Sequence, residues 1–139
     1  MYKANWNIEN MPNPKRINTV LEFIGAGDIM ALEVMKYNKN NFQKLKEMNI
    51  FKNIEENSKE EVKEILVNHF ESCLNNEEEK IYKSYFDLDT LSTKDNYYAI
   101  LHRYSEIRGN IYEVLVLDNK EQLMYSMHCN FGDKNRALD

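Results

Sequence analysis

The stretch NYYAILHRYSEIRGNIYEVLVLDNKEQLMYSMHCNF, residues 96–131, decides the expected fold. Segments 96–104, 111–117 and 123–131 are typical of strands, and the last alternates apolar residues with polar or small ones at the strand period of two. Arg108-Gly109-Asn110 fills the first gap and 118–121 the second, and these residue types favour tight turns. The pattern predicts a three-stranded antiparallel meander.

Two helices are expected before the meander. Ser58 and Glu61 have the spacing of a capping box, in which each side chain satisfies a backbone N–H of the other residue. Apolar residues then recur every three or four positions over 62–74, which predicts one buried helix stripe. A second helix is expected after Asn75-Asn76, and a further short helix over 42–48.

The chain before residue 38 is ambiguous. Apolar runs at 17–24 and 29–37 flank a Gly-Ala-Gly-Asp turn, so they fit either a hairpin or two helices, with Gly25 ending the first helix and Asp28 capping the second. We favour the hairpin. Residues 2–8 alternate polar and apolar side chains and predict an N-terminal strand.

These elements predict a single α+β domain spanning residues 1–139. Its antiparallel sheet would contain the N-terminal strand, the hairpin and the meander, packed against two or three central helices. Of the residues, 42% are hydrophobic and 29% charged, as in ordinary globular proteins. Neither a signal peptide nor an apolar run of roughly 20 residues is present, so we expect a cytoplasmic protein in which Cys73 and Cys129 are reduced thiols.

The charge of the chain is concentrated in its middle. The formal net charge is −5, and residues 51–90 carry five basic and eleven acidic side chains. An acidic segment of this kind argues against direct nucleic-acid binding, which requires a basic surface. Frequent Asn and Lys with only four Arg suggest an AT-rich bacterial or phage genome.

No motif for catalysis, cofactor or metal binding is present. Gly25-Ala26-Gly27 lacks the third glycine and the helix of a dinucleotide site. His128 and Cys129 are adjacent on a strand and point to opposite faces, so they cannot easily share a metal. His69 is expected to be a partly buried helix residue, and His102 could form a sheet-face site with Glu113 or Tyr104. The sequence therefore predicts no metal and no cofactor.

Size and charge favour a stoichiometric inhibitor of another protein, as in immunity proteins, antitoxins and phage anti-defence proteins. The acidic segment would steer a basic or nucleic-acid-handling target, and exposed aromatic residues would supply the contact. The residues expected to bind the partner are Glu60, Glu61, Glu64, Glu77, Glu78, Glu79, Tyr104, Tyr112 and Arg108.

Two other classes remain open. A small-ligand protein could stack a nucleotide-like ligand on the meander while arginine holds a phosphate. The residues for that alternative are Tyr97, Tyr98, Arg103 and Tyr125. An unrecognised small enzyme is the third class, with His102 as its candidate group. A homodimer through an uncovered sheet edge is also possible.

Overall fold

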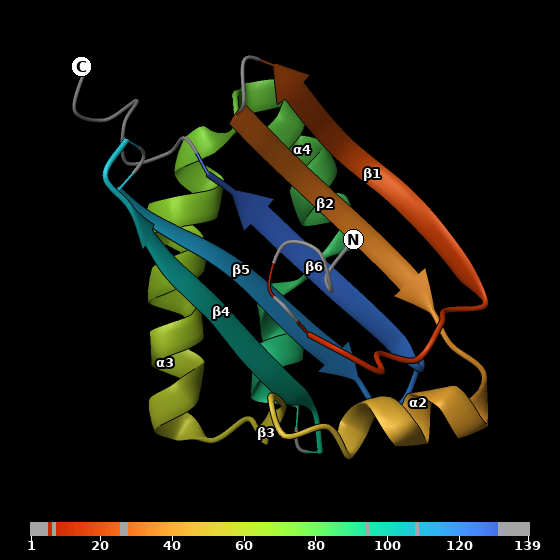
Figure 1. Ribbon diagram of the computed structural model, residues 1–139. Helices are drawn as coiled ribbons and strands as arrows, with labels where there is room; N and C mark the ends of the chain where they lie inside the picture. The colour runs from red at the N-terminus through yellow and green to blue at the C-terminus, as the bar shows by residue number, and fades with distance from the viewer. Residues whose placement is uncertain (1–5, 7, 26–27, 94, 108, 131–139) are drawn as a thin grey trace.

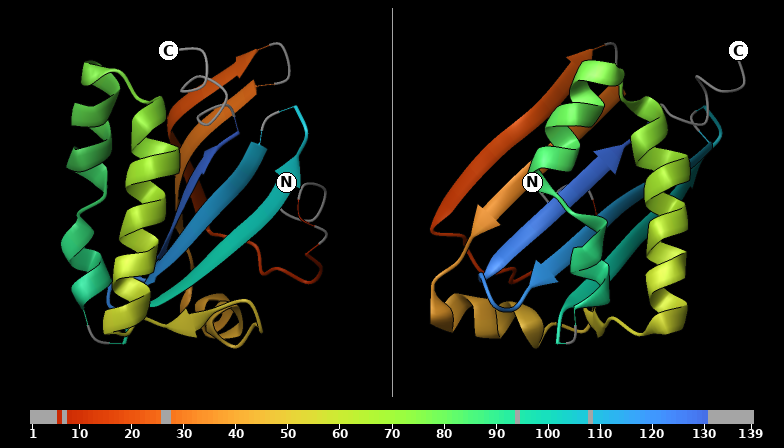
Figure 2. Two further views of the ribbon diagram at one scale, coloured as in Figure 1. Left: turned by 90° about the vertical axis from the view of Figure 1, so that its left-hand side faces the viewer. Right: turned by 180° about the vertical axis from the view of Figure 1, so that it is seen from behind.

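A computed structural model describes residues 6, 8–25, 28–93, 95–107 and 109–130. One antiparallel sheet forms the centre of the molecule, with the two longest helices packed on one of its faces and a shorter helix against one end of the other face (Figures 1 and 2). The spatial order of the strands is β1-β2-β6-β5-β4-β3. Their bounds are β1 Arg16–Gly25, β2 Asp28–Lys36, β3 Lys52–Asn53, β4 Tyr97–Ser105, β5 Gly109–Asp118 and β6 Leu123–Cys129.

The C-terminal meander is confirmed in order and direction, because β4 pairs with β5 and β5 with β6. Gly109 has a φ of 77°, a conformation that glycine adopts without strain, so the first turn is formed as its sequence suggested. In the second connection it is Gln122, with a φ of 54°, that takes the left-handed conformation.

The hairpin is also confirmed. β1 and β2 pair from Arg16↔Lys36 to Gly25↔Asp28, with a bulge between Thr19 and Leu21. β2 pairs with β6 on its other side. Strand pairing on both sides explains why β2 is extended although its residues have good helix propensity, since tertiary context overrides propensity.

The expected N-terminal strand is wrong where the chain can be described. Trp6 has helical backbone geometry, and Ile8 and Glu9 belong to no strand; residues 1–5 and 7 lie outside the described residues. Residues 8–15 instead cross the face of the sheet opposite its two longest helices before β1 begins (Figure 1). Ile8, one of the apolar residues of the alternating pattern, is half-buried against that face instead of lying in a paired strand.

Helix α2 spans Lys39–Lys46 and is capped by Asn38, whose side chain accepts a hydrogen bond from the Asn41 N–H. Helix α3 (Glu56–Ile65) continues into a π-helical turn (Leu66–Phe70) and a short 3₁₀ turn (Glu71–Cys73).

Helix α4 (Asn76–Tyr85) follows the cap at Asn75 and runs back in the opposite direction to α3 (Figure 2). A 3₁₀ turn (Leu88–Ser92) then leads to β4.

The expected capping box at Ser58 and Glu61 is wrong. The N-cap is Glu55, whose extended backbone precedes the helix, and its N–H donates to the Ser58 hydroxyl at 2.7 Å. Ser58 therefore sits three residues inside the cap. For α4, Asn75 and Glu78 do form a reciprocal capping box, with hydrogen bonds of 2.8 and 2.9 Å.

Two apolar clusters stabilise the sheet. Between the sheet and the helices, Val62 of α3 and Leu66 of the π-helical turn pack with Tyr82 and Phe86 of the following segment against Met127 and its neighbours. On the opposite face, a second cluster packs α2 against one end of the sheet. Burial of both faces explains why apolar residues occur on both faces of β5 and β6.

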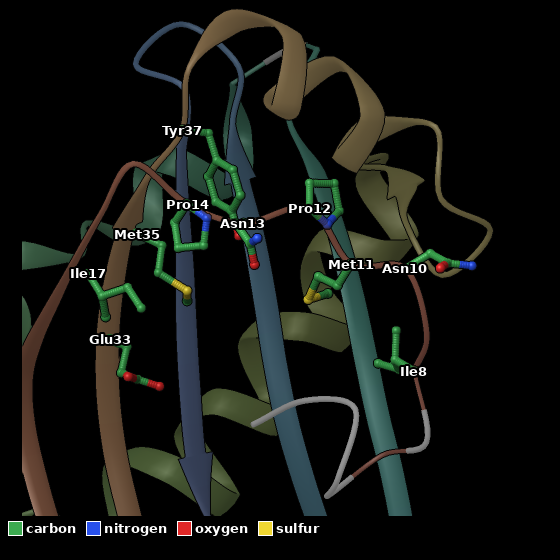
Figure 3. Close-up of a pocket in the computed structure, with 10 residues that line it drawn as sticks. All are labelled: Ile8, Asn10, Met11, Pro12, Asn13, Pro14, Ile17, Glu33, Met35 and Tyr37. Atoms are coloured by element: carbon green, nitrogen blue, oxygen red, sulfur yellow. The ribbon is translucent and has the colours of Figure 1, made fainter.

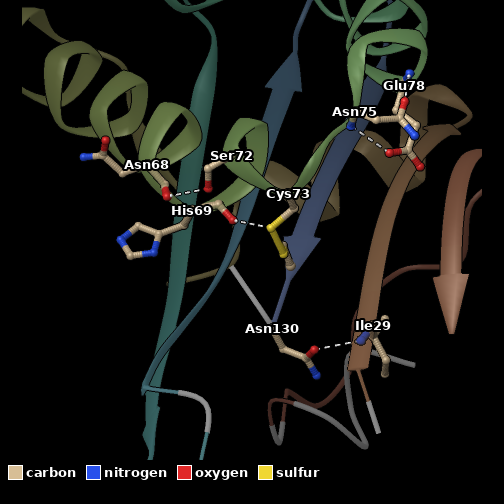
Figure 4. The surroundings of a disulfide bond; sticks show 9 residues. Ile29, Asn68, His69, Ser72, Cys73, Asn75, Glu78 and Asn130 are labelled. Atoms are coloured by element: carbon tan, nitrogen blue, oxygen red, sulfur yellow. Dashed lines mark hydrogen bonds between the residues drawn. A yellow bond between two sulfur atoms is a disulfide. The ribbon is translucent and has the colours of Figure 1, made fainter. Parts of the chain in front are cut away.

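The expectation of two free thiols is wrong, because Cys73 and Cys129 form a disulfide with Cα atoms 6.9 Å apart (Figure 4). The bond joins the end of the helix layer to the end of β6, where Cys129 faces the helices. The two cysteines are 56 positions apart, so no local sequence pattern predicts the bond. The π-helical and 3₁₀ turns after α3 place Cys73 beside the end of β6.

Candidate functional site

The face of the sheet opposite α3 and α4 contains a buried group of polar side chains. Strand register places Glu33 of β2 opposite Ser126 of β6, and Glu113 of β5 opposite His128 of β6. Their relative exposures are only 3–7%. A buried carboxylate normally has a cation or several hydrogen bonds to compensate for lost hydration, so these groups are a reason to look for a site here.

A cavity of about 320 Å³ lies beside Glu33, between residues 8–14 and the sheet (Figure 3). This volume is at the lower end of ligand pockets in proteins. Figure 3 shows the Glu33 carboxylate directed from β2 toward β6. Most other walls are apolar, and the lining residues are Ile8, Asn10, Met11, Pro12, Asn13, Pro14, Ile17, Met35 and Tyr37.

Glu33 has little local compensation for its charge. The Thr19 hydroxyl donates to its Oε2 at 3.5 Å, the outer limit of a hydrogen bond, and no basic side chain of the described residues forms an ion pair with it. Burial raises the pKa of Glu33 above its ordinary value, and the charges of Glu113 and then Glu22 raise that pKa further. A cation placed in the cavity would reverse this effect.

Glu113 and His128 form the second part of the cluster. Glu113 Oε1 lies 3.4 Å from His128 Nδ1, but the geometry is not that of a hydrogen bond. Among the described residues, neither that nitrogen nor Glu113 Oε2 has a hydrogen-bond partner. The Trp6 ring meets the imidazole edge-to-face at 6.3 Å, and the Arg103 guanidinium lies over Trp6 at 5.0 Å. Trp6 thus packs between His128 of this pair and Arg103.

We expect Glu33→Gln to stabilise the free protein at neutral pH. The folded-state pKa of Glu33 is raised, so folding favours the protonated form; stability from this group is present at low pH and is lost as the pH rises above about 4.5. The neutral amide avoids that loss. Melting temperatures from about pH 4 to about pH 7 should therefore diverge, with the variant gaining on the wild type as the pH rises. Parallel curves for the two proteins would contradict a buried, uncompensated Glu33.

The remaining hollows are less suited to a ligand. A hollow of about 570 Å³ between β3 and the start of α3 is larger, but it is lined mainly by polar and charged side chains, including Lys52, Glu55 and Glu61. Across the described residues, no group of three or more His, Cys, Asp or Glu side chains is placed to hold a metal ion. Nor does any helix of the described chain have the length and apolarity to cross a membrane.

No protein-family model, curated protein or solved structure matches this chain. The site therefore has to be interpreted from its own residues.

The glutamates predicted to bind a partner lie on two different helices. Glu60 and Glu61 are exposed in the middle of α3 and Glu64 next to its end, whereas Glu77 is exposed at the start of α4. Because α3 and α4 run in opposite directions, the starts of the two helices lie at opposite ends of the helix layer (Figure 2).

The two remaining glutamates have local roles on α4. Glu78 completes the α4 capping box, and Glu79 pairs with Lys83 at 2.8 Å, which raises the pKa of the lysine. Both are partly buried.

The two tyrosines predicted to contact a partner lie on β4 and β5 of the sheet, not on the helices. Tyr104 of β4 is 69% exposed, as a contact residue would be. Tyr112 is partly buried between two histidines, His102 at 4.5 Å and His69 at 4.4 Å. Arg108 lies outside the described residues.

The residues of the nucleotide-like alternative are distributed over both faces. Tyr125 is buried in the helix-facing core, with its ring 5.0 Å from that of Phe86. Tyr98 packs at the edge of the same core, but Tyr97 packs in the opposite cluster. Arg103 is exposed on the face opposite α3 and α4, over Trp6. Successive strand residues alternate between faces, so this set does not converge on one ligand.

The three histidines occupy two separate environments. His69 and His102 flank Tyr112 on the helix side, whereas His128 is buried on the other face beside Glu113. His102 therefore cannot act together with Glu113, which points away from it. As expected, His128 and Cys129 face opposite sides of β6.

Sequence reasoning missed Glu33 and named Glu113 only as a candidate partner of His102, although a signal for both was present. Each interrupts an apolar strand: Glu33 in DIMALEVMK and Glu113 in GNIYEVLVLD. A charge on a strand that is buried on both faces must have a partner, a ligand or a shifted pKa. That test singles out both residues once β2 and β5 are recognised as central strands.

Proposed function

We propose that this protein binds a small organic cation, an amine with an apolar body, in the cavity beside Glu33. One observation carries the proposal: a buried carboxylate with a single weak hydrogen bond lies at the wall of an otherwise largely apolar cavity. An ammonium group would supply the missing counter-charge, and the hydrocarbon part would be removed from water by Ile17, Met35 and Tyr37.

The chemistry of the walls supports an amine over an anion. Among the residues that the structure describes, no Lys or Arg lines the cavity, so a phosphate or carboxylate would meet Glu33 without compensation from them. Asn10 and Asn13 add amide groups at the opening for a second polar function on the ligand. The proposal belongs to the small-ligand class of function. It differs from the nucleotide-like alternative in the site and in the charge of the ligand, which is a cation instead of a phosphate-bearing anion.

Calorimetric titration with a series of arylalkylamines and the alcohols of the same shape tests the proposal. We expect the amines to bind at least about tenfold more tightly than their alcohols, because a charged hydrogen bond in a partly desolvated site contributes about 1.5–3 kcal/mol. Glu33→Gln should remove this preference. Glu106→Gln is the matched control, since Glu106 is an exposed carboxylate near the β4–β5 turn that neither lines the cavity nor contributes to the pKa shift of Glu33, and it should leave the preference unchanged.

Equal affinity for amines and alcohols would contradict the proposal, as would an amine preference that survives in Glu33→Gln. A preference for carboxylates would contradict it too. Protein-detected nuclear magnetic resonance then separates the cavity from other sites, because resonances of Met35 and Tyr37 should shift on binding while those of the hollow near β3 should not.

A protein inhibitor of the immunity, antitoxin or phage anti-defence type is the second candidate. Its support is the set of exposed glutamates on the helix layer together with the exposed ring of Tyr104. Because the two groups of glutamates lie on different helices, reversing the charge of Glu60, Glu61 and Glu64 together should slow association with a basic target at low ionic strength, whereas reversing Glu77 alone should not. An unchanged on-rate would count against this candidate.

Two features of the chain bear on the cellular compartment of the protein, and they favour different ones. A cytoplasmic, bacterial or phage origin remains the expectation from composition. The Cys73–Cys129 disulfide is an argument for an oxidising compartment, since disulfides rarely persist in a reducing cytosol.

A further inference from the structure

Exposed apolar side chains gather along one edge of the molecule. Of the eight exposed large apolar residues in the described chain, five lie on β1 or on α4, the helix that packs against β1. They are Ile17, Phe23, Ile24, Ile81 and Tyr85. Such clustering at one edge is typical of an interaction surface rather than of scattered surface residues.

β1 is the edge strand at which these side chains meet. It is ten residues long, and no described strand pairs with its outer side. Edge strands that avoid association are usually short, charged or interrupted by proline. β1 has only two charged residues, Arg16 and Glu22, and no proline.

The sequence of β1 is complementary to itself when two copies run antiparallel. With a two-fold axis between Val20 and Leu21, Ile17 of one copy lies opposite Ile24 of the other, and Thr19 lies opposite Glu22. Ile17 and Ile24 are the most exposed apolar residues of the strand, at 59% and 69%. Each copy contributes both residues, so the arrangement contains two such isoleucine pairs.

The bulge in β1 is what makes this register possible. In an unbroken strand, residues 17 and 24 would point to opposite faces, because their separation is odd. The bulge between Thr19 and Leu21 shifts the alternation by one, so that Ile17 pairs with Met35 and Ile24 with Ile29 on one face of β2. The paired isoleucines of the two copies therefore lie on the same face of the sheet, the one opposite α3 and α4.

Charge does not oppose the pairing. Arg16 lies opposite Gly25 of the other copy and Glu22 opposite Thr19, so like charges do not face each other across the axis. On the helix side, Phe23 of β1 and the two α4 residues Ile81 and Tyr85, one turn apart, extend the apolar surface beyond the strands.

We propose that a second copy of this chain docks on β1 and forms a two-fold dimer by antiparallel β1–β1 pairing about Val20 and Leu21. The two sheets then form one continuous sheet, with both helix layers on the same side. Ile17 belongs both to this interface and to the wall of the amine cavity, but dimerisation is measured without an amine, so either proposal can fail without the other.

Analytical ultracentrifugation of the intact chain and two double variants tests the dimer and its register. The wild type should reach twice the 16.6 kDa chain mass at roughly micromolar to 100 µM concentration. Ile17→Lys/Ile24→Lys places like charges opposite each other and should raise the dimer dissociation constant by about 30-fold or more. Ile17→Glu/Ile24→Lys places opposite charges in the same pairs and should retain the dimer.

Ile107→Lys is the matched control, because Ile107 is 71% exposed near the β4–β5 turn, and this variant should dimerise like the wild type. All variants replace exposed side chains, and an unchanged melting temperature at low protein concentration verifies that they fold. A monomeric wild type at 100 µM overturns the proposal. Equal loss of dimer in both double variants overturns the register, and loss in Ile107→Lys overturns the placement of the interface.

Discussion

Replacing Cys73 and Cys129 together with alanine is expected to lower the free energy of unfolding by about 4 kcal/mol, the value for a cross-link that closes a loop of this length. The two cysteines are 56 positions apart, the loop between them includes α4, β4, β5 and β6, and the bond joins the helix layer to the end of β6. Without it, the unfolded chain gains the conformational freedom of that loop. The loss is a large fraction of the stability of a typical small domain.

Urea unfolding with and without dithiothreitol measures this effect. Reduced wild type and the double alanine variant should have the same midpoint, well below that of the oxidised wild type. The reductant should not alter the midpoint of the variant, which serves as the control. If reduction left the wild-type midpoint unchanged, Cys73 and Cys129 would not be bonded in solution.

Replacing Phe86 with alanine is expected to cost about 3–5 kcal/mol, as large-to-small substitutions of buried aromatic residues do. Phe86 is 2% exposed and follows α4, where its ring lies 6.1 Å from that of Tyr82 and 5.0 Å from that of Tyr125. The substitution removes the contact through which the helix layer holds β6 at Tyr125.

Equilibrium unfolding of the oxidised protein at low concentration measures that loss. Phe86→Leu keeps most of the volume and should cost less than about 1.5 kcal/mol, which gives a second measurement if the alanine variant does not fold. Tyr104→Ala is the control, because its ring is 69% exposed and its loss should change stability by no more than about 0.5 kcal/mol. Similar losses at Phe86 and Tyr104 would contradict the assignment of Tyr125 to the core.

Local patterns predicted most of the elements of this fold. The alternation over 123–131 predicted β6, and Asn75 with three following glutamates predicted the start of α4. The hairpin was favoured on its turn and its short apolar runs, and pairing on both sides of β2 confirms it. Such features depend on neighbours in the chain, and for that reason a single sequence reveals them.

The wrong predictions concern features for which the local pattern is degenerate. Ser58 fits a capping residue at either of two positions in the box, and only the backbone of Glu55 shows which is used. The alternation near the N-terminus fits a strand, but it equally fits a segment laid across a sheet face with one side half-buried. The disulfide depends on two positions 56 residues apart.

The candidate site was less predictable than the fold. The residues proposed from the sequence to bind a partner or ligand were tyrosines, arginines and clustered glutamates, because such side chains are often exposed and often found in binding sites. Folding placed Tyr125 in the core and the starts of α3 and α4 at opposite ends of the helix layer. The residues that now define the site, Glu33 and Glu113, looked like isolated charges in apolar strands.

The sequence by itself determined the α+β class, the meander, the hairpin and the approximate limits of the helices, because periodicity, turn residues and capping act over a few neighbouring positions. Only the tertiary structure decided that β2 lies beside β6, that Cys73 reaches Cys129, and that Glu33 lies buried beside a cavity. These features depend on which distant strands pair and which face each element covers. Burial and charge compensation are properties of those pairings, so they are settled only when the whole chain has packed.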